Sequence, residues 1–112
     1  MSDVVQLYDE ADKLKEQGNL EGAAEKLQEA LAADDDYALA HSALAVVQQR
    51  LGNHDQAIQH AKRVCELEPN DPFSYTAMSV TYQRAYAGTN NLEYIRMAEE
   101  AMEKSRMLSQ GM

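Results

Sequence analysis

Apolar residues recur at helical spacing along the chain, with short polar breaks between the runs. Leu7, Ala11 and Leu14 stand at i, i+4 and i+7, and later windows repeat the same spacing. No window alternates apolar and polar residues over four or more positions, as a half-buried strand would. The pattern predicts an all-α chain of six helices, at about residues 3–17, 20–33, 37–51, 54–67, 71–87 and 92–109.

Residues at the predicted helix ends have the chemistry of helix caps. Asn70-Asp71-Pro72 opens the fifth helix with an acidic cap and a proline in the first turn, and Asp36 precedes the third. Gly18-Asn19 and Gly52-Asn53 follow the first and third helices, where glycine adopts the left-handed conformation without a steric penalty.

Gly18 and Gly52 lie 34 residues apart, and the same shift places Ala11 on Ala45. A helix–turn–helix period of this length resembles the tetratricopeptide repeat family. The resemblance covers nearly the whole chain, although Glu10, His41 and Gln48 depart from the family pattern. The small residues that carry it are Ala11, Ala45, Ser79, Ala23, Ala57 and Ala98. It implies one domain, residues 1–112, built as a right-handed superhelical stack of three helix–turn–helix hairpins over residues 4–37, 38–71 and 72–109.

The third unit is longer than the period predicts. Its alanine, Ala98, comes seven residues later than a shift from Ala57 would place it. Because an α-helical turn takes about 3.6 residues, seven residues add close to one turn to each helix and keep both faces in register. We therefore expect an extended helical hairpin; the alternative is a longer irregular loop.

Composition and charge narrow the choice of partners. The chain has 112 residues, 45% of them apolar and 26% charged, which is typical of a folded domain and unlike a disordered tail. Its formal net charge is −9, and residues 1–36 hold most of the excess acid. This field disfavours nucleic acid and anionic membranes as partners. The acidic end is either a solvated face or a surface that steers a basic partner.

Targeting signals are missing from the sequence. The longest apolar run falls far short of the roughly 18 residues of a membrane span. Met1 and Ser2 open the chain without a basic start or the apolar core of an export signal. The single cysteine, Cys65, excludes an internal disulfide and fits a reducing compartment. We expect no membrane association and a cytoplasmic location.

The residue pattern does not favour catalysis. His54 and His60 are six residues apart, which puts them on different sides of a helix, and no cluster has the spacing of a zinc or calcium site. Cys65 occupies the place of the apolar Leu31 in the first unit, so we expect a buried thiol. The sequence thus predicts a protein that is not an enzyme and has no catalytic residue, metal or cofactor.

The family resemblance implies a concave groove lined by the first helix of each unit, where a peptide segment of another protein docks. The expected function is that of a non-catalytic adaptor or scaffold. Helical spacing places the following residues on the groove: Val5, Tyr8, Asp12, Leu39, Ser42, Val46, Gln49, Arg50, Phe73, Thr76, Val80, Gln83 and Arg84.

A short motif recurs within this set: Val46, Gln49 and Arg50 return at Val80, Gln83 and Arg84. Glutamine can pair with a peptide backbone and arginine can grip a carboxylate, so we expect these residues to hold the polar part of the peptide. The alternatives are structural: Glu16 and Arg50 form an ion pair between units, and Leu39 and Phe73 pack between units.

Two further expectations concern partners. Some family members grip chaperone C-termini through lysines and asparagines, and the matching places here hold residues that cannot form that clamp: Tyr8, Asp12, Ala43, Phe73 and Ala77. At the other end, Met97, Met107, Leu108 and Met112 add apolar surface to the last helix. This surface either mediates homo-oligomerisation or docking, which suits an assembly or chaperone-like subunit that masks an apolar client segment, or is buried under the preceding helix.

Overall fold

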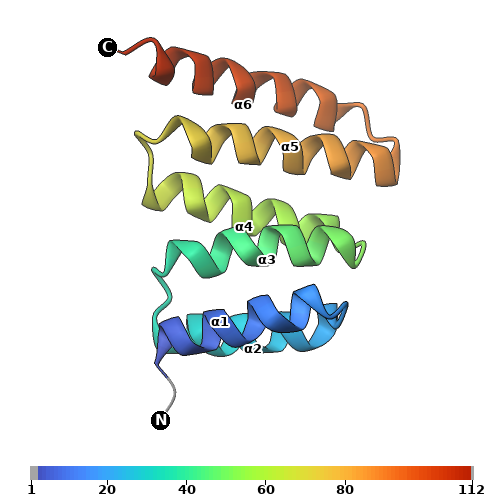
Figure 1. Ribbon diagram of the computed structural model, residues 1–112. Helices are drawn as coiled ribbons and strands as arrows, with labels where there is room; N and C mark the ends of the chain where they lie inside the picture. Colours follow the sequence, from blue (N-terminus) through green and yellow to red (C-terminus); the bar gives the residue numbers. More distant parts are fainter. Residues whose placement is uncertain (1–2, 112) are drawn as a thin grey trace.

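Six α-helices joined by short turns make up residues 3–111, the part of the chain that the computed structural model describes (Figure 1). They are α1 (Val4–Glu16), α2 (Leu20–Ala33), α3 (Ala38–Arg50), α4 (His54–Leu67), α5 (Pro72–Thr89) and α6 (Glu93–Ser109). No residue in that range lies in a strand, so the predicted all-α class is confirmed. The predicted bounds agree with the observed ones to within two residues. Met1, Ser2 and Met112, which entered the expectations about export and the chain end, lie outside the described residues.

Turn chemistry explains most of the helix ends. Gly18 and Gly52 have φ angles of +85° and +86°, the left-handed conformation that ends α1 and α3. The Asp71 carboxylate accepts a 3.0 Å hydrogen bond from the backbone N–H of Phe73. The expectation that Asp36 caps α3 is wrong: α3 follows Tyr37 without a side-chain cap, and the Asp36 carboxylate instead lies 2.6 Å from the Arg63 guanidinium of α4.

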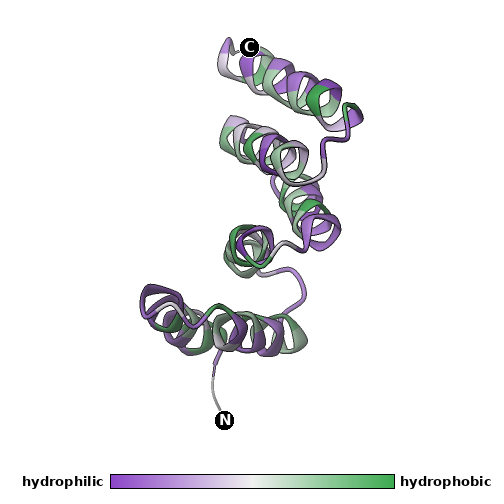
Figure 2. Cartoon of the chain, turned by 90° about the vertical axis from the view of Figure 1, so that its right-hand side faces the viewer, coloured by the Kyte–Doolittle hydropathy of each residue, from purple (hydrophilic) through white to green (hydrophobic). Residues whose placement is uncertain are grey.

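The helices pair into three antiparallel hairpins that stack from one end of the molecule to the other (Figures 1 and 2). The first helix of each hairpin contacts the first helix of the next, so α1, α3 and α5 share one wall of the stack. Helices α1 and α6 lie at opposite ends of the stack (Figure 1). None of the helices in the described part of the chain has the length and apolar character needed to cross a bilayer.

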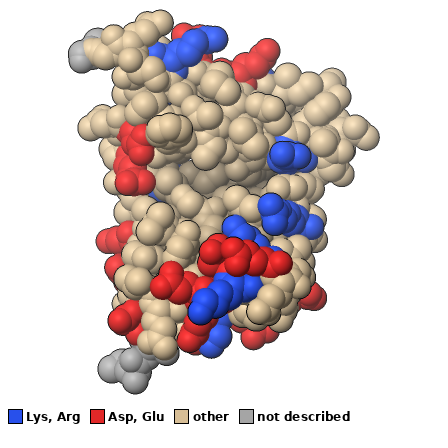
Figure 3. All heavy atoms as spheres, viewed as in Figure 1, with Lys and Arg blue, Asp and Glu red and all other residues tan. Residues whose placement is uncertain are grey.

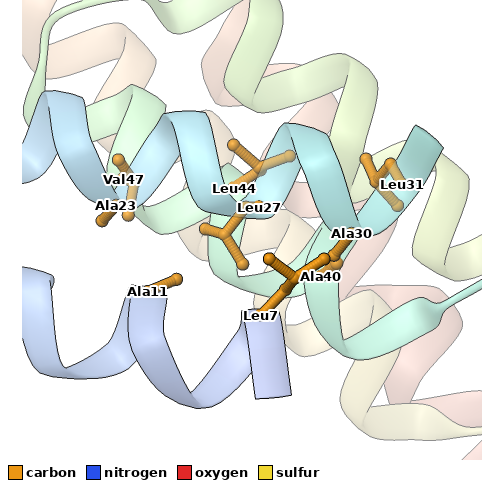
Figure 4. Packing of buried hydrophobic residues seen from close by; sticks show 9 residues of the cluster. All are labelled: Leu7, Ala11, Ala23, Leu27, Ala30, Leu31, Ala40, Leu44 and Val47. Carbon is orange, nitrogen blue, oxygen red and sulfur yellow. The ribbon is translucent and has the colours of Figure 1, made fainter. Parts of the chain in front are cut away.

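The largest apolar cluster joins the first hairpin to α3 (Figure 4). Leu27 of α2 and Leu44 of α3 are fully buried and lie against each other at its centre. Ala11, Ala23 and the other small residues around them let the three helix backbones approach closely. A second cluster, formed by Ile58, Tyr82, Ala85 and Ala98, holds the third hairpin on α4.

The third hairpin is extended by helix, as predicted, and not by an irregular loop. Helices α5 and α6 have 18 and 17 residues, against 13 or 14 in the other four. Asn90, with φ of 61°, ends α5 in the left-handed conformation. The tip reaches back to α4, where the Tyr94 hydroxyl donates a 3.3 Å hydrogen bond to Asp55.

Candidate functional site

The wall formed by α1, α3 and α5 carries a row of exposed apolar side chains near the starts of the three helices. Val5, Leu39 and Phe73 occupy equivalent positions and are 57%, 53% and 80% exposed. Side chains this exposed do not fill an interface between units, so the alternative that Leu39 and Phe73 pack between hairpins is wrong. Exposed apolar groups gathered on one face are typical of a binding surface.

A cavity of about 300 Å³ opens on this wall where α3, α4 and α5 meet. Five of the predicted groove residues line it: Ser42, Val46, Gln49, Val80 and Arg84. Val46 and Val80 are 40% and 41% exposed, so the groove is open and is not sealed inside a closed bundle. A volume of this size is at the lower end of the range for ligand sites in proteins.

The two arginines of the recurring motif are free of carboxylates. Among residues 3–111, neither Arg50 nor Arg84 forms an ion pair, and the expected alternative of a Glu16–Arg50 pair is not found. The other three arginines each pair with an acidic side chain: Arg63, Arg96 and Arg106. Figure 3 shows a hollow of uncharged atoms between α3 and α5, with basic groups at its edge.

Tyr8 and Asp12 lie on the same wall but fill the junction between the first two hairpins. The Tyr8 ring stands edge-on to Tyr37, with centroids 6.2 Å apart. Burial, followed by the negative charge of Asp12, raises the pKa of the Tyr8 hydroxyl. The Asp12 carboxylate lies 3.7 Å from the Lys15 ammonium. Only about 10 Å³ of space remains at this junction, so these side chains offer contact area and no cavity.

The structure directs Thr76 and Gln83 away from the cavity between α3 and α5. The Thr76 hydroxyl lies 2.7 Å from the Ser105 hydroxyl of α6, and the Gln83 amide donates to the Ser79 hydroxyl at 3.2 Å. Because they are seven residues apart, Thr76 and Gln83 share the face of α5 that α6 covers in part. Gln83 therefore lies outside the cavity that Gln49 lines, although the recurring motif places the two residues at equivalent positions.

Sequence reasoning missed the floor of the cavity. Ala61 and Val64 of α4 form part of it, together with Ala77 and Thr81 of α5. The prediction assigned the groove to the first helix of each unit and left out the second. The signal was present in the repeat, since Ala61 stands where the first unit has the much larger Leu27.

The titratable groups near the middle hairpin serve the packing of the helices. Burial, followed by the proximity of His41, lowers the pKa of His60. Cys65 is buried, as expected, and burial raises the pKa of its thiol to about 11. In the described range 3–111, no three His, Cys, Asp or Glu side chains are placed to hold a metal ion. What the groove offers around the cavity is apolar contact, the Gln49 amide, the guanidinium groups of Arg50 and Arg84, and the hydroxyl groups of Ser42 and Thr81.

Comparisons with known proteins agree with this geometry. A family model described as Tetratricopeptide repeat matches residues 8–72, more than half of the chain. The crystal structure of MamA is similar to 96% of this chain, with a TM-score of 0.81 and 21% identity, and the chain spans 59% of the MamA chain. The second TPR of Spaghetti (RPAP3), bound to HSP90 peptide SRMEEVD, is similar over 96% of this chain and 93% of its own, with a TM-score of 0.77 and 16% identity. No curated protein matched the sequence.

Proposed function

The chain belongs to the tetratricopeptide repeat family, whose repeats are protein-interaction modules, and from this premise we propose that it binds a peptide segment of another protein. The segment lies along the groove of α1, α3 and α5. The chain acts as a non-catalytic adaptor or scaffold that brings this partner into a larger assembly.

The observation that carries the proposal is the pair of unpaired arginines beside an apolar cavity. The chain has a net charge of −9, yet Arg50 and Arg84 have no carboxylate partner among the described residues, and Arg84 lines the cavity. A guanidinium can form two parallel hydrogen bonds with one carboxylate, so each arginine is ready to receive an acidic group of the peptide.

Apolar contacts complete the site. Val46 and Val80 are available to apolar side chains of the peptide, while Val5, Leu39 and Phe73 extend the contact along the starts of the helices. The half-exposed Gln49 amide can donate to and accept from a peptide backbone. This combination of an apolar surface with a few polar groups is typical of peptide-binding grooves.

The experiment selects peptides from a random library displayed on phage, using the full chain as bait. Synthetic copies of the selected peptides are then titrated calorimetrically against the wild type, R50A/R84A and R96A/R106A. The last variant also removes two positive charges, but from α6, outside the groove. We expect R50A/R84A to weaken binding at least about tenfold with unchanged helix content, and R96A/R106A to bind as the wild type does. Equal affinity of R50A/R84A and wild type, or no selected peptide, would refute the proposal.

The peptide bound by the second TPR of Spaghetti is not the segment we propose. The places that match the chaperone clamp hold Tyr8, Asp12, Ala43, Phe73 and Ala77, none of which supplies a lysine or an asparagine. The Asp12 carboxylate would also repel the acidic side chains of SRMEEVD. We expect no complex between this chain and SRMEEVD in a fluorescence anisotropy titration in which the Spaghetti domain serves as the positive control.

A second candidate function, self-association in an assembly or chaperone-like subunit, is favoured by the apolar surface of the third hairpin. Leu92 and Met107 are exposed, and a cavity of about 430 Å³ opens between α5 and α6 beside Met102. We infer that two such ends meet each other, and that the third hairpin does not stack on the first hairpin of another copy. The reason is that α1 has Asp9 and Lys13 at the positions where α3 has Ala43 and Val47, the residues that pack on the preceding hairpin. Sedimentation equilibrium at several concentrations tests this; a monomer at every concentration removes it.

A further inference from the structure

The cavity between the second and third hairpins has a counterpart between the first and second. A shift of 34 residues converts every residue that lines the first junction into a residue that lines the second. Tyr8, Ala11, Asp12, Lys15, Leu27, Ala43 and Val47 correspond in this order to Ser42, Ala45, Val46, Gln49, Ala61, Ala77 and Thr81. The two junctions are therefore the same site, one repeat apart.

The two junctions differ greatly in free volume. The first has about 10 Å³, roughly the space of one water molecule, and the second about 300 Å³. Two exchanges of large for small side chains explain the difference, since Ser42 replaces Tyr8 and Ala61 replaces Leu27. Protein interiors are packed closely, so the first junction shows the filled form of the site and the second its open form.

We propose that the open junction binds a bulky aromatic side chain of the partner, which takes the place that the Tyr8 ring has one repeat earlier. The inference rests on the proposed function, peptide binding in the groove, and adds the identity of the anchoring residue. The first junction supplies the template: there an aromatic ring lies half-buried against Leu27, Ala43 and Val47. In the second junction Ala61, Ala77 and Thr81 surround the empty space.

Charge complementarity specifies what flanks the aromatic residue. Arg84 lines the cavity without a carboxylate partner among the described residues, and Arg50 has the equivalent place on α3. A carboxylate close to the ring would pair with Arg84 while the ring fills the cavity. The partner segment is therefore an aromatic residue followed or preceded by Asp or Glu.

A second copy of this chain is the competing occupant, because Phe73 is exposed and Asp71 lies two residues before it. Two features disfavour it. The Asp71 carboxylate is held at the start of α5, where it accepts the backbone N–H of Phe73, and this restricts its approach to Arg84 of another copy. Two copies would also bring together chains that each carry a net charge of −9.

The test uses two small probes, p-cresol and 3-(4-hydroxyphenyl)propionate, titrated into the full chain and followed by amide chemical shifts in NMR spectra. Both should bind weakly, with millimolar dissociation constants, and should shift the amides of Ala45, Ala61 and Ala77. The propionate, which adds a carboxylate to the same ring, should bind several-fold more tightly than p-cresol in the wild type, and Arg84→Ala should remove that difference.

Refilling the cavity gives the decisive variants. Ser42→Tyr copies the first junction and should abolish binding of both probes, while Ser42→Ala, which leaves the cavity open, should bind like the wild type. If Ser42→Tyr fails to fold, Ala61→Leu fills the same space from α4. The inference is overturned if the probes shift amides elsewhere, or if the folded, refilled variants bind them as well as Ser42→Ala does.

The same variants separate this inference from the proposed function. If the selected peptides need Arg50 and Arg84 but tolerate Ser42→Tyr, the groove binds peptides without an aromatic anchor and only the inference fails. If the probes bind the cavity but no peptide is selected, the proposed function fails. A dimer that Phe73→Ala dissociates, and that competes with p-cresol, would make a second copy the occupant and overturn the assignment to a partner.

Discussion

The imidazole rings of His41 and His60 meet at a distance of 3.0 Å between their Nδ1 atoms and so join α3 to α4. The other ring nitrogen of His41, Nε2, lies 2.8 Å from the backbone oxygen of Asp35. Because that oxygen can only accept, Nε2 of His41 carries the hydrogen, and in the neutral ring Nδ1 accepts. His60 must then donate from its own Nδ1, which fixes the tautomers of both rings.

This pair predicts that the chain loses stability as the pH falls through the range of histidine titration. Burial and His41 lower the pKa of folded His60 below 6.5, so the unfolded chain takes up a proton before the folded chain does. The contribution of His60 to the free energy of unfolding is therefore complete above about pH 6.5. It is lost as the pH falls towards the pKa of His60 in the folded chain. Urea denaturation at pH 7.5, 6.5 and 5.5 measures it.

The measurement needs a control for other groups next to the histidine pair that could titrate in the same pH range. The backbone oxygen of Asp35, which accepts from His41, does not titrate. The Asp36 carboxylate forms an ion pair with Arg63, one turn from His60. Carboxylates titrate mainly below pH 5, outside the chosen range. His60→Gln can still donate to His41 but does not titrate, so it should flatten the loss between pH 6.5 and 5.5. The same loss in His60→Gln would show that another group is responsible.

At the tip of the third hairpin, we expect the effect of a substitution at Gly88 on stability to depend on the side chain of His54. A Cβ atom at Gly88 of α5 would collide with Nε2 of His54 on α4. Gly88→Ala should therefore lower the free energy of unfolding by about 1 kcal/mol, the lower end of the cost of overpacking. His54→Ala removes the collision. In that background Gly88→Ala should raise the free energy of unfolding by a few tenths of a kcal/mol, because alanine favours the helix more than glycine does.

A double-mutant cycle from urea denaturation checks this coupling. The sign of the Gly88→Ala effect should reverse between the two backgrounds. If Gly88→Ala changes stability equally with and without the His54 ring, the tip does not rest on α4 through this contact.

Because the Cys65 thiol is buried, we expect it to react slowly with disulfide reagents. Cys65 donates to the backbone oxygen of Ser74 at 3.4 Å and has a pKa of about 11. At pH 8 only about one thiol in a thousand is ionised, and the thiolate is the reactive form. Reaction with 5,5′-dithiobis(2-nitrobenzoate) should be at least about 100-fold slower in the folded chain than in urea. Glutathione in the same buffers corrects for the effect of urea on the reagent, and a folded thiol that reacts as fast as glutathione would contradict the prediction.

Local chemistry explains why the helices could be predicted. Gly18 and Gly52 mark the turns because no other residue takes the left-handed conformation at so little cost, and the 34-residue shift between them fixes the repeat. The extension of the third hairpin followed from the register of Ala98, since only whole helical turns keep its face towards α5. These features depend on neighbours along the chain, which the sequence displays directly.

Contacts between helices were harder to predict. Helical spacing groups Thr76 with the residues of one face, but it does not give the position of α6, which takes up the Thr76 hydroxyl through Ser105. His41 departs from the repeat pattern, and its partner His60 lies on the next helix, where no motif points to it. The cavity forms because small side chains stand at two positions in different helices, Ser42 of α3 and Ala61 of α4, where the first repeat has large ones.

Leu27 and Ala61 occupy equivalent positions in the repeat, and we expect opposite effects on stability when their sizes are exchanged. Leu27 is fully buried in the largest apolar cluster, so Leu27→Ala should leave a void and lower the free energy of unfolding by about 2 to 5 kcal/mol. Ala61 lines open space, so Ala61→Leu should bury apolar atoms without displacing a neighbour and raise the free energy of unfolding by about 1 kcal/mol. Urea denaturation of the two variants beside the wild type measures both effects, with equal slopes required for the comparison. A loss of stability in Ala61→Leu would mean that the side chain does not fit, and that the second junction is not the open form of the first.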